Sequence, residues 1–263
     1  MSEQFPSIRR QKRTPKPGIS IAVLILLAVM SWSVYASKTN DSTKPATADE
    51  SLLHDVETVY KWSGSEYRGG AEGARWSFRW DGRSDREAAE ELAASLGFTL
   101  SSELVESEPV DIMAENETAR MKLWIQSRPQ AYDSDENKPF ELVLLLDMDA
   151  GADQTAIAEA LKPVNQATKP LDMQAGFTVR GEPIRTGSVE RLEDAASAQE
   201  VEAYDDGHTK SLTYSSKLLR TSVRSGGADV NLQLAESAAI GGGSPELIIG
   251  VPLITGDYTL QNN

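Results

Sequence analysis

Residues 75–80 have the sequence RWSFRW, in which three aromatic residues alternate with two arginines and a serine. Successive side chains of a β-strand point to opposite faces of the sheet. The spacing therefore predicts a strand with Trp76, Phe78 and Trp80 on one face. Such a face could anchor a partner or stack on a sugar. Beside a helix with an apolar stripe it is more typical of a hydrophobic core, which is the interpretation we favour.

The residues after this strand predict a helix and then a series of strands. Ser84 and Glu87 have the Ser-x-x-Glu spacing of a capping box, and Gly97 closes the helix that they open. The buried stripe of this helix is expected to be Ala88, Leu92 and Leu96. Strands are predicted over 98–105, 110–114, 119–126 and 140–147. The segment 141–148, ELVLLLDM, is apolar on both faces and is expected in the middle of a sheet.

Helices are also predicted before and after this first group of strands in the sequence, and a second group of strands follows. The first helix carries Leu52, Leu53, Val56, Val59 and Tyr60 on one side. Asp153 is expected to cap another helix, whose buried face carries Ile157, Leu161 and Val164. Pro163 is expected to end or kink this helix. The second group comprises a strand at 176–182, a helix at 189–201, and strands at 212–219, 229–235 and 246–255. The order predicts an α+β fold of two topologically similar repeats, each an antiparallel sheet with helices on one face.

The N-terminal region contains the one long apolar run of the chain. Residues 1–18 form a basic tail, and residues 19–36 form a transmembrane anchor or a signal peptide. The basic flank predicts that the tail is cytoplasmic and that the rest of the chain is outside. We favour a single-pass anchor spanning Ile19 to Tyr35; cleavage after Ala36 would give a secreted protein. A polar linker, 37–48, leads to an ectodomain at 49–263, whose repeats are expected at about 49–168 and 169–263.

Charge and cysteine content exclude several classes of function. Five of the 26 basic and one of the 40 acidic residues precede Ser37, so the ectodomain has 21 basic and 39 acidic residues and a net charge of −18. Such a domain repels phosphate backbones, which argues against nucleic acid as a partner. The chain has no cysteine, which excludes disulfides, thiolate metal sites and cysteine nucleophiles.

Three segments of the second half resemble the YwmB-like family of uncharacterised, membrane-anchored or secreted bacterial proteins. They are SLTYSSKL at 211–218, VNLQLAESA at 230–238 and LIIGVPLITGDY at 247–258. The resemblance extends to the leader and to the helix before the first tryptophan strand. It implies the fold of the TATA-box-binding proteins, with two α/β repeats. The family has no established catalytic or binding residues, so the resemblance implies none here, and fold alone does not carry DNA binding with it.

No residue pattern is strong enough to assign a catalytic, cofactor-binding or metal site. Asp147, Asp149 and Asp153 suggest a calcium loop, but position twelve is Ala158 instead of the usual bidentate glutamate. A strand end followed by a helix N-terminus explains these acids better. The two histidines, His54 and His208, are far apart in the sequence and give little reason to expect zinc.

We therefore expect a non-enzymatic envelope protein that binds or scaffolds a partner at the membrane or in the wall. The alternative is an envelope enzyme that acts on cell-wall glycan through paired carboxylates, such as Glu90 with Glu91 or Glu106 with Glu108. Among 39 acidic residues, pairs of this kind arise by chance. A third hypothesis is a structural domain stabilised by calcium.

Overall fold

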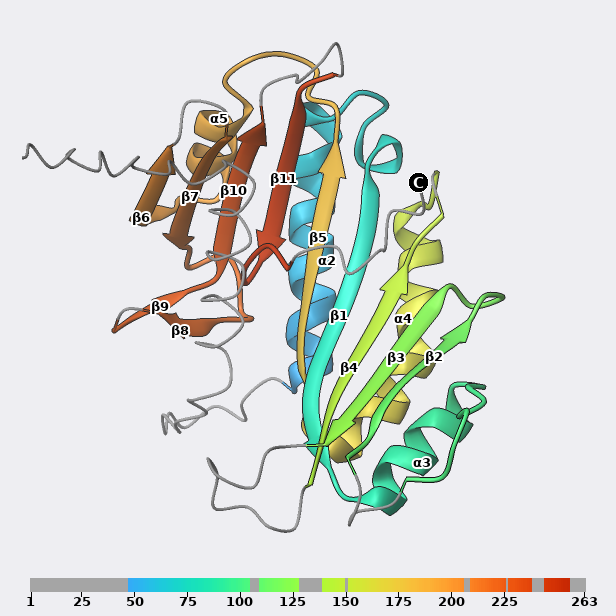
Figure 1. The fold of residues 1–263 in the computed structure, drawn as a ribbon. Coiled ribbons are helices and arrows are strands. Elements are labelled where there is room, and N and C mark those ends of the chain that lie inside the picture. The colour runs from blue at the N-terminus through green and yellow to red at the C-terminus, as the bar shows by residue number, and fades with distance from the viewer. Residues whose placement is uncertain are drawn as a thin grey trace, which may run out of the picture.

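A nine-stranded antiparallel sheet organises the protein (Figure 1). The computed structural model describes residues 47–104, 109–127, 139–149, 151–205, 209–225, 227–237 and 244–255. The strands of the sheet lie in the order β2-β3-β4-β1-β5-β11-β10-β7-β6. Their bounds are β1 (Arg75–Ser84), β2 (Asp111–Asn116), β3 (Met121–Ser127), β4 (Phe140–Asp147), β5 (Gln174–Gly181), β6 (Gln199–Asp205), β7 (Thr209–Ser215), β10 (Leu232–Ser237) and β11 (Glu246–Val251). A separate hairpin joins β8 (Val223–Ser225) to β9 (Ala228–Val230).

The helices form a second layer against this sheet; in Figure 1 most of them lie behind its strands, and α3 is seen beyond the edge formed by β2. They are α2 (Ala48–Glu66), α3 (Arg86–Ser95), α4 (Gln154–Thr168) and α5 (Ser188–Ala195), with short 3-10 turns at Ala71–Gly73 and Lys169–Leu171. We call β1 to β4 with α3 and α4 the first half, and β5 to β11 with α5 the second half. A large antiparallel sheet with helices packed against it confirms the predicted α+β class.

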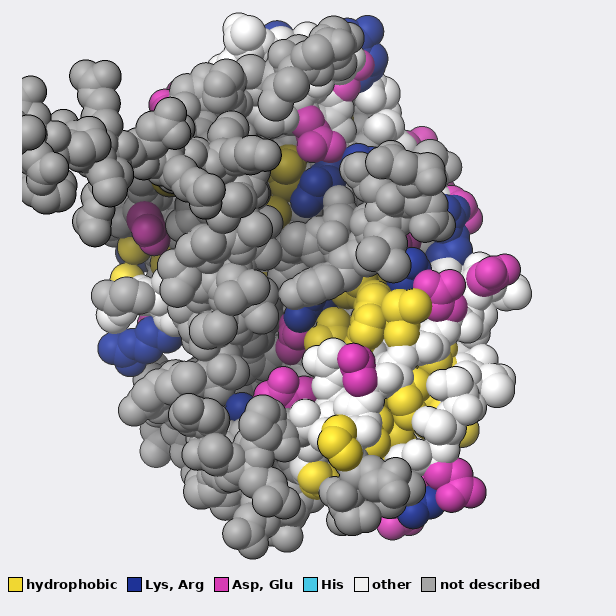
Figure 2. Space-filling model, in the orientation of Figure 1, with side chains coloured by type: hydrophobic (Ala, Val, Ile, Leu, Met, Phe, Trp, Pro, Cys, Tyr) yellow, Lys and Arg dark blue, Asp and Glu magenta, His cyan; other side chains and the backbone are white. Residues whose placement is uncertain are grey.

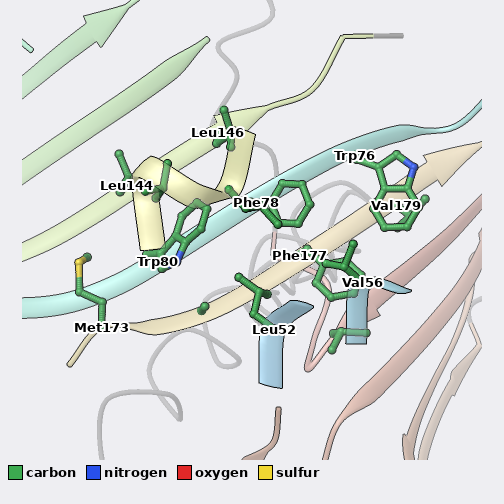
Figure 3. Close-up of a cluster of buried hydrophobic side chains, with 14 of the residues drawn as sticks. Leu52, Val56, Trp76, Phe78, Trp80, Leu144, Leu146, Met173, Phe177 and Val179 are labelled. Atoms are coloured by element: carbon green, nitrogen blue, oxygen red, sulfur yellow. The ribbon is translucent and has the colours of Figure 1, made fainter. Parts of the chain in front are cut away.

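The aromatic face of β1 lies in the core between the two layers, as predicted. Trp76, Phe78 and Trp80 are each 1% exposed. The ring centroids of Phe78 and Phe177 on β5 are 5.7 Å apart, and those of Trp76 and Phe177 are 5.8 Å apart. Figure 3 shows this cluster closed by Leu52 and Val56 of α2 and by leucines of β4. The strand therefore joins both halves of the sheet to the helical layer.

The predicted helix after β1 is present, but its cap differs. Asp85, and not Ser84, is the N-cap residue, and its carboxylate accepts a hydrogen bond from the Ala88 amide at 2.9 Å. Ser84 is instead the last, buried residue of β1. Gly97, two residues after the last helical residue, Ser95, has a φ of +73°, and the Phe98 amide donates to the Ala93 carbonyl. This pair of features is a Schellman motif.

Several predicted bounds of strands and helices differ from those in the structure. Residues 98–104 form no strand, because Phe98 belongs to the helix end. Pro163 does not end α4, which continues to Thr168 with Leu161 and Val164 buried. Val201 lies in β6, an edge strand that the sequence did not indicate. The predicted strand 229–235 is divided between β9 and β10, and those at 212–219 and 246–255 end at Ser215 and Val251.

Two buried carboxylates fix α2 to the second half. Asp55 is fully buried and accepts hydrogen bonds from the amides of Arg220 (2.9 Å) and Thr221 (2.7 Å). Glu66 is 3% exposed and accepts three hydrogen bonds from the Arg191 guanidinium of α5, the shortest at 2.7 Å. Burial raises the pKa of Asp55 despite the two amides. Burial also acts to raise the pKa of Glu66, but the hydrogen bonds from Arg191 and Ser188 outweigh it and lower that pKa.

The N-terminal part of the predicted architecture lies outside the described residues. This applies to the basic tail, to the apolar segment 19–36 and to nearly all of the linker. Within the part of the chain that the structure describes, no helix combines the length and the apolar character needed to cross a membrane.

Replacing Phe78 tests the central cluster. The Phe78→Ala variant should lose about 3–5 kcal/mol of unfolding free energy, because it removes a buried aromatic ring and leaves a cavity between β1 and β5. Urea denaturation followed by tryptophan fluorescence measures this. Glu91→Ala, on the exposed side of α3, is the control and should be close to neutral. A near-neutral Phe78→Ala variant would contradict the assigned core.

Replacing Glu66 tests the ion pair and its pH dependence. Glu66→Gln should cost about 1–2 kcal/mol at pH 7, because it removes charged hydrogen bonds to Arg191. The folded-state pKa of Glu66 is below its ordinary value of 4.5. The stability from ionised Glu66 is therefore fully present above that value and is lost as the pH falls through the folded-state pKa. Denaturation from pH 7 to pH 3 should show the difference between wild type and variant shrinking below 4.5. Glu57→Gln, at an exposed pair with Lys61, should leave stability nearly unchanged.

Candidate functional site

The face of the sheet opposite the helices carries a strip of apolar side chains. We call this face the outer face, and the strip formed by Met113, Trp124, Val143 and Leu145 the apolar strip. Register places Met113 opposite Trp124 and Trp124 opposite Val143, so these three side chains form one row across β2, β3 and β4. Leu145 extends the row along β4. Figure 2, in the same orientation as Figure 1, shows apolar side chains gathered over β3 and β4.

The strip exists because β3 and β4 are apolar on both of their faces. Leu123, Ile125, Leu142 and Leu144 point into the core and are at most 1% exposed. Their neighbours point the other way, where Trp124, Val143 and Leu145 are half-buried and Met113 is 45% exposed. A contiguous apolar patch that is still accessible is typical of an interaction site. An aromatic side chain at its centre is the usual anchor of such a site.

Charged side chains border the strip on both sides. On β1, Arg79 forms a bidentate pair with Asp81, with donor–acceptor distances of 2.7 and 2.5 Å. On the β2–β3 side, Lys122 is paired with Glu115 at 3.2 Å. Both signs of charge are therefore present at the border. This arrangement suits a partner segment with an apolar centre and polar flanks, held by burial and oriented by the charged border.

The chain after β11 turns back over the outer face of the second half. We call residues 252–255 the return segment. The Ile254 amide donates to the Gln233 side chain of β10 at 2.9 Å, and the Thr255 amide lies 3.4 Å from the Thr178 hydroxyl of β5. Gly250 makes this approach possible, because a Cβ there would overlap the backbone of Leu253 and Ile254.

The three aspartates of the suggested calcium loop are each engaged separately. Asp147 accepts a hydrogen bond from Ser77 at 2.7 Å, Asp149 forms an ion pair with Arg120, and Asp153 caps α4 through the Ala156 amide. Within the described ranges, no group of three or more His, Asp or Glu side chains could hold a metal ion.

The other candidate residues do not come together either. His54 contacts the Leu218 carbonyl at 3.1 Å, and His208 lies outside the described residues. Glu90 pairs with Arg86 on the surface of α3, and the neighbouring Glu91 is exposed. Glu106 and Glu108 also lie outside the described residues. No described residue that the sequence suggested for chemistry is thus part of a convergent site.

The sequence did contain a signal for the apolar strip. In MKLWIQS of β3, the side chains of Met121, Leu123 and Ile125 are buried, which leaves Trp124 on the opposite face. Lys122 and Gln126 lie on the same face as Trp124. An aromatic residue between two polar residues on one face of a strand is the pattern that indicates an exposed apolar site. The apolar residues on both sides of β4 were interpreted as burial on both faces.

Comparison with known proteins establishes no family for this chain. No protein-family model matches the chain, and no curated protein matches it. Among solved structures, a chain from the crystal structure of the E. coli DhaR(N)–DhaL complex is 12% identical and has a TM-score of 0.12, with 87% of this chain and 99% of that chain covered. A similarity this weak supports no conclusion about fold or function.

Replacing Gly250 tests the return segment. Gly250→Ala should lower the unfolding free energy by about 1–3 kcal/mol, because the added methyl overlaps backbone that has to shift. Gly64→Ala is the matched control: Gly64 lies in α2 with nothing within 4 Å of an added Cβ. There the same change should stabilise by about 0.5–1 kcal/mol. Thermal and urea denaturation measure both variants, and equal effects would contradict the tight turn after β11.

Proposed function

We propose that this protein is a non-enzymatic, extracytoplasmic protein of the cell envelope whose apolar strip binds a partner at the membrane or in the wall. The single observation that carries this proposal is the accessible row of Met113, Trp124 and Val143 on the face of the sheet opposite the helices. A contiguous apolar row that is still partly accessible, with Met113 45% exposed, is typical of an interaction site.

The chemistry of the strip indicates the kind of partner. An extended protein segment with one or two large apolar side chains would bury Trp124 and its neighbours, and its polar groups would meet the Arg79–Asp81 and Lys122–Glu115 pairs. The net charge of −18 after residue 36 argues against nucleic acid and against docking on an anionic membrane surface.

The proposed location depends on residues 1–36. The basic residues before Ile19 and the apolar run up to Tyr35 support an anchor with a cytoplasmic tail, or a signal peptide cleaved after Ala36. A single-pass anchor would hold the domain at the outer surface of the membrane, within reach of membrane and wall components. A glycan-degrading enzyme is not favoured, because no described pair of acids is both buried and convergent.

A two-repeat architecture is part of the proposal and is supported by topology. In each half the first strand lies at the centre of the sheet: β1 in the first half and β5 in the second. The last strand of each half, β4 or β11, pairs with that central strand. The remaining strands lie further out, in reverse order along the chain. The first strand of each half also leads to a helix that ends in a Schellman motif. In the second half Ser197, with φ +46°, takes the place of Gly97, and the Ala198 amide donates to Glu193. Membership of the YwmB-like family, with its TATA-box-binding-like fold, is proposed on the three segments at 211–218, 230–238 and 247–258.

Cysteine labelling tests location and binding together, because the native chain has no cysteine. The Met113→Cys variant places a thiol in the strip, and Glu91→Cys places one on α3 as the control. Both should react with a membrane-impermeant maleimide in intact cells if the domain is outside. The thiol at 113 should react several-fold more slowly in cells than in the purified protein, and the thiol at 91 equally in both. Adding Trp124→Lys should restore fast labelling at 113 in cells.

Two results would overturn separate parts of the proposal. If both thiols react only after the membrane is permeabilised, the extracytoplasmic location is wrong. If the thiol at 113 reacts equally fast in cells and in the purified protein, no partner covers the strip and the binding function is wrong.

A further inference from the structure

We propose that the partner of the apolar strip binds as an added β-strand along the edge of β2 that faces away from β3, through a segment with an apolar residue between two basic residues at alternate positions. This inference rests on the proposed function, because it specifies the binding mode and the partner class of the same site. The added strand would bring its apolar side chain beside Met113, at the end of the row that Met113 forms with Trp124 and Val143.

The backbone of β2 is available for such pairing. β2 is the first strand of the nine-stranded sheet, and no described strand pairs with its second edge. In an antiparallel pair, alternate residues direct their N–H and C=O groups toward the partner strand, and the others direct theirs away from it. Half of the backbone groups of Asp111–Asn116 therefore point to the edge that faces away from β3, where an extended segment can bind them.

The other edge strand, β6, is less suited to strand addition. A bulge between Glu200 and Glu202 interrupts its pairing with β7, and all residues of β6 except Tyr204 are exposed. Bulges and exposed charges hinder the addition of a strand at a sheet edge. β2 pairs with β3 in one continuous register, and its Ile112 and Ala114 are each 4% exposed. β2 is therefore the regular, firmly packed edge of the sheet.

The helical layer extends past the edge formed by β2. In Figure 1, α3 is seen beyond this strand. The Asn116 side chain at the end of β2 donates a hydrogen bond to the carbonyl of Leu96, at the end of α3, at 2.9 Å. An added strand would thus have helical structure beneath its inward-facing side chains, as the strands of the sheet do.

The outer face of β2 selects the composition of the partner. It carries Asp111, Met113 and Glu115 at alternate positions, and all three are exposed. Residues directly opposite each other on neighbouring strands share a face, and opposite charges or two apolar side chains stabilise such a pair. The matching segment therefore has a basic, an apolar and a basic residue at alternate positions. This pattern is the same in both chain directions, so it fits a parallel or an antiparallel strand. The net charge of −18 after residue 36 also attracts a basic segment.

A second copy of the chain fits this edge poorly. An antiparallel pair of β2 strands centred on Met113 would place the two methionines opposite each other and continue the apolar row. The same register would place Asp111 opposite Glu115 of the other copy at both ends of the pair. Like charges directly opposite each other destabilise a strand pair. The edge therefore favours a basic segment of another protein.

The test uses the full-length chain purified in detergent and a fluorescent peptide with the central sequence lysine-threonine-leucine-threonine-lysine between threonines. Fluorescence anisotropy measures binding of the peptide and of two isomers, each N-methylated at alternate residues of opposite parity. Strand addition uses the amides of one parity only. One isomer should therefore bind as the parent peptide does, and the other at least about tenfold more weakly. Hydrogen exchange of residues 111–116 should slow when the parent peptide is bound.

A charge exchange tests the predicted composition. Glu115→Lys should weaken binding of the lysine peptide about fivefold and strengthen binding of a peptide with glutamates at the two lysine positions. Glu202→Lys on β6 is the matched control, because it makes the same change of charge on the other edge strand. It should leave both affinities unchanged.

Three results would overturn the inference. Equal binding of the two N-methylated isomers would show that side chains alone hold the segment. Absence of binding at about 1 mM peptide, or equal effects of Glu115→Lys and Glu202→Lys, would show that the edge does not select a basic segment. Protection of residues 111–116 without peptide that disappears on dilution would make a second copy the occupant. None of these results depends on the cell-labelling experiment, so the binding mode can fail while the proposed function stands, and the reverse.

Discussion

The pairing of β1 with β4 on one side and with β5 on the other is the constraint on which the rest of the structure depends. Eight residue pairs join β1 to β4 and seven join it to β5, so this one strand connects the two halves. The side chains on the two faces of β1 have different roles. Trp76, Phe78 and Trp80 fill the core, and Arg79 and Asp81 form an ion pair on the outer face. A change in register by one residue would exchange these faces and bury the charges.

Much of this could be predicted from residue spacing, because the core follows simple periods. The alternation in RWSFRW predicted the aromatic core, and the stripe of Ile157, Leu161 and Val164 predicted α4. Predictions were less accurate where a local hydrogen bond decides the outcome. Asp85 caps α3 instead of Ser84, and Phe98 completes a helix end instead of starting a strand. Which residue caps a helix, and where the helix ends, depends on local backbone geometry that residue spacing does not specify.

The apolar strip was harder to predict for a different reason. An apolar residue on both faces of a strand predicts burial, but it does not specify what buries the second face. The helices that the structure describes pack against one side of the sheet, so the second apolar face of β4 lies on the outer face. The position of Trp124 beside Val143 follows from the register of β3 and β4. That register is a long-range property that a single strand cannot reveal.

The attachment of α2 has a mechanical consequence. This helix begins one residue after Thr47 and precedes β1 in the chain, yet its two buried carboxylates hold elements of the second half, through Arg220 and Thr221 and through Arg191. Tension applied to the chain ahead of Thr47 therefore acts in part on the hydrogen bonds that join Asp55 and Glu66 to the second half. Leu52 and Val56 of the same helix pack into the cluster around β1, so the load is shared between the second half of the sheet and β1.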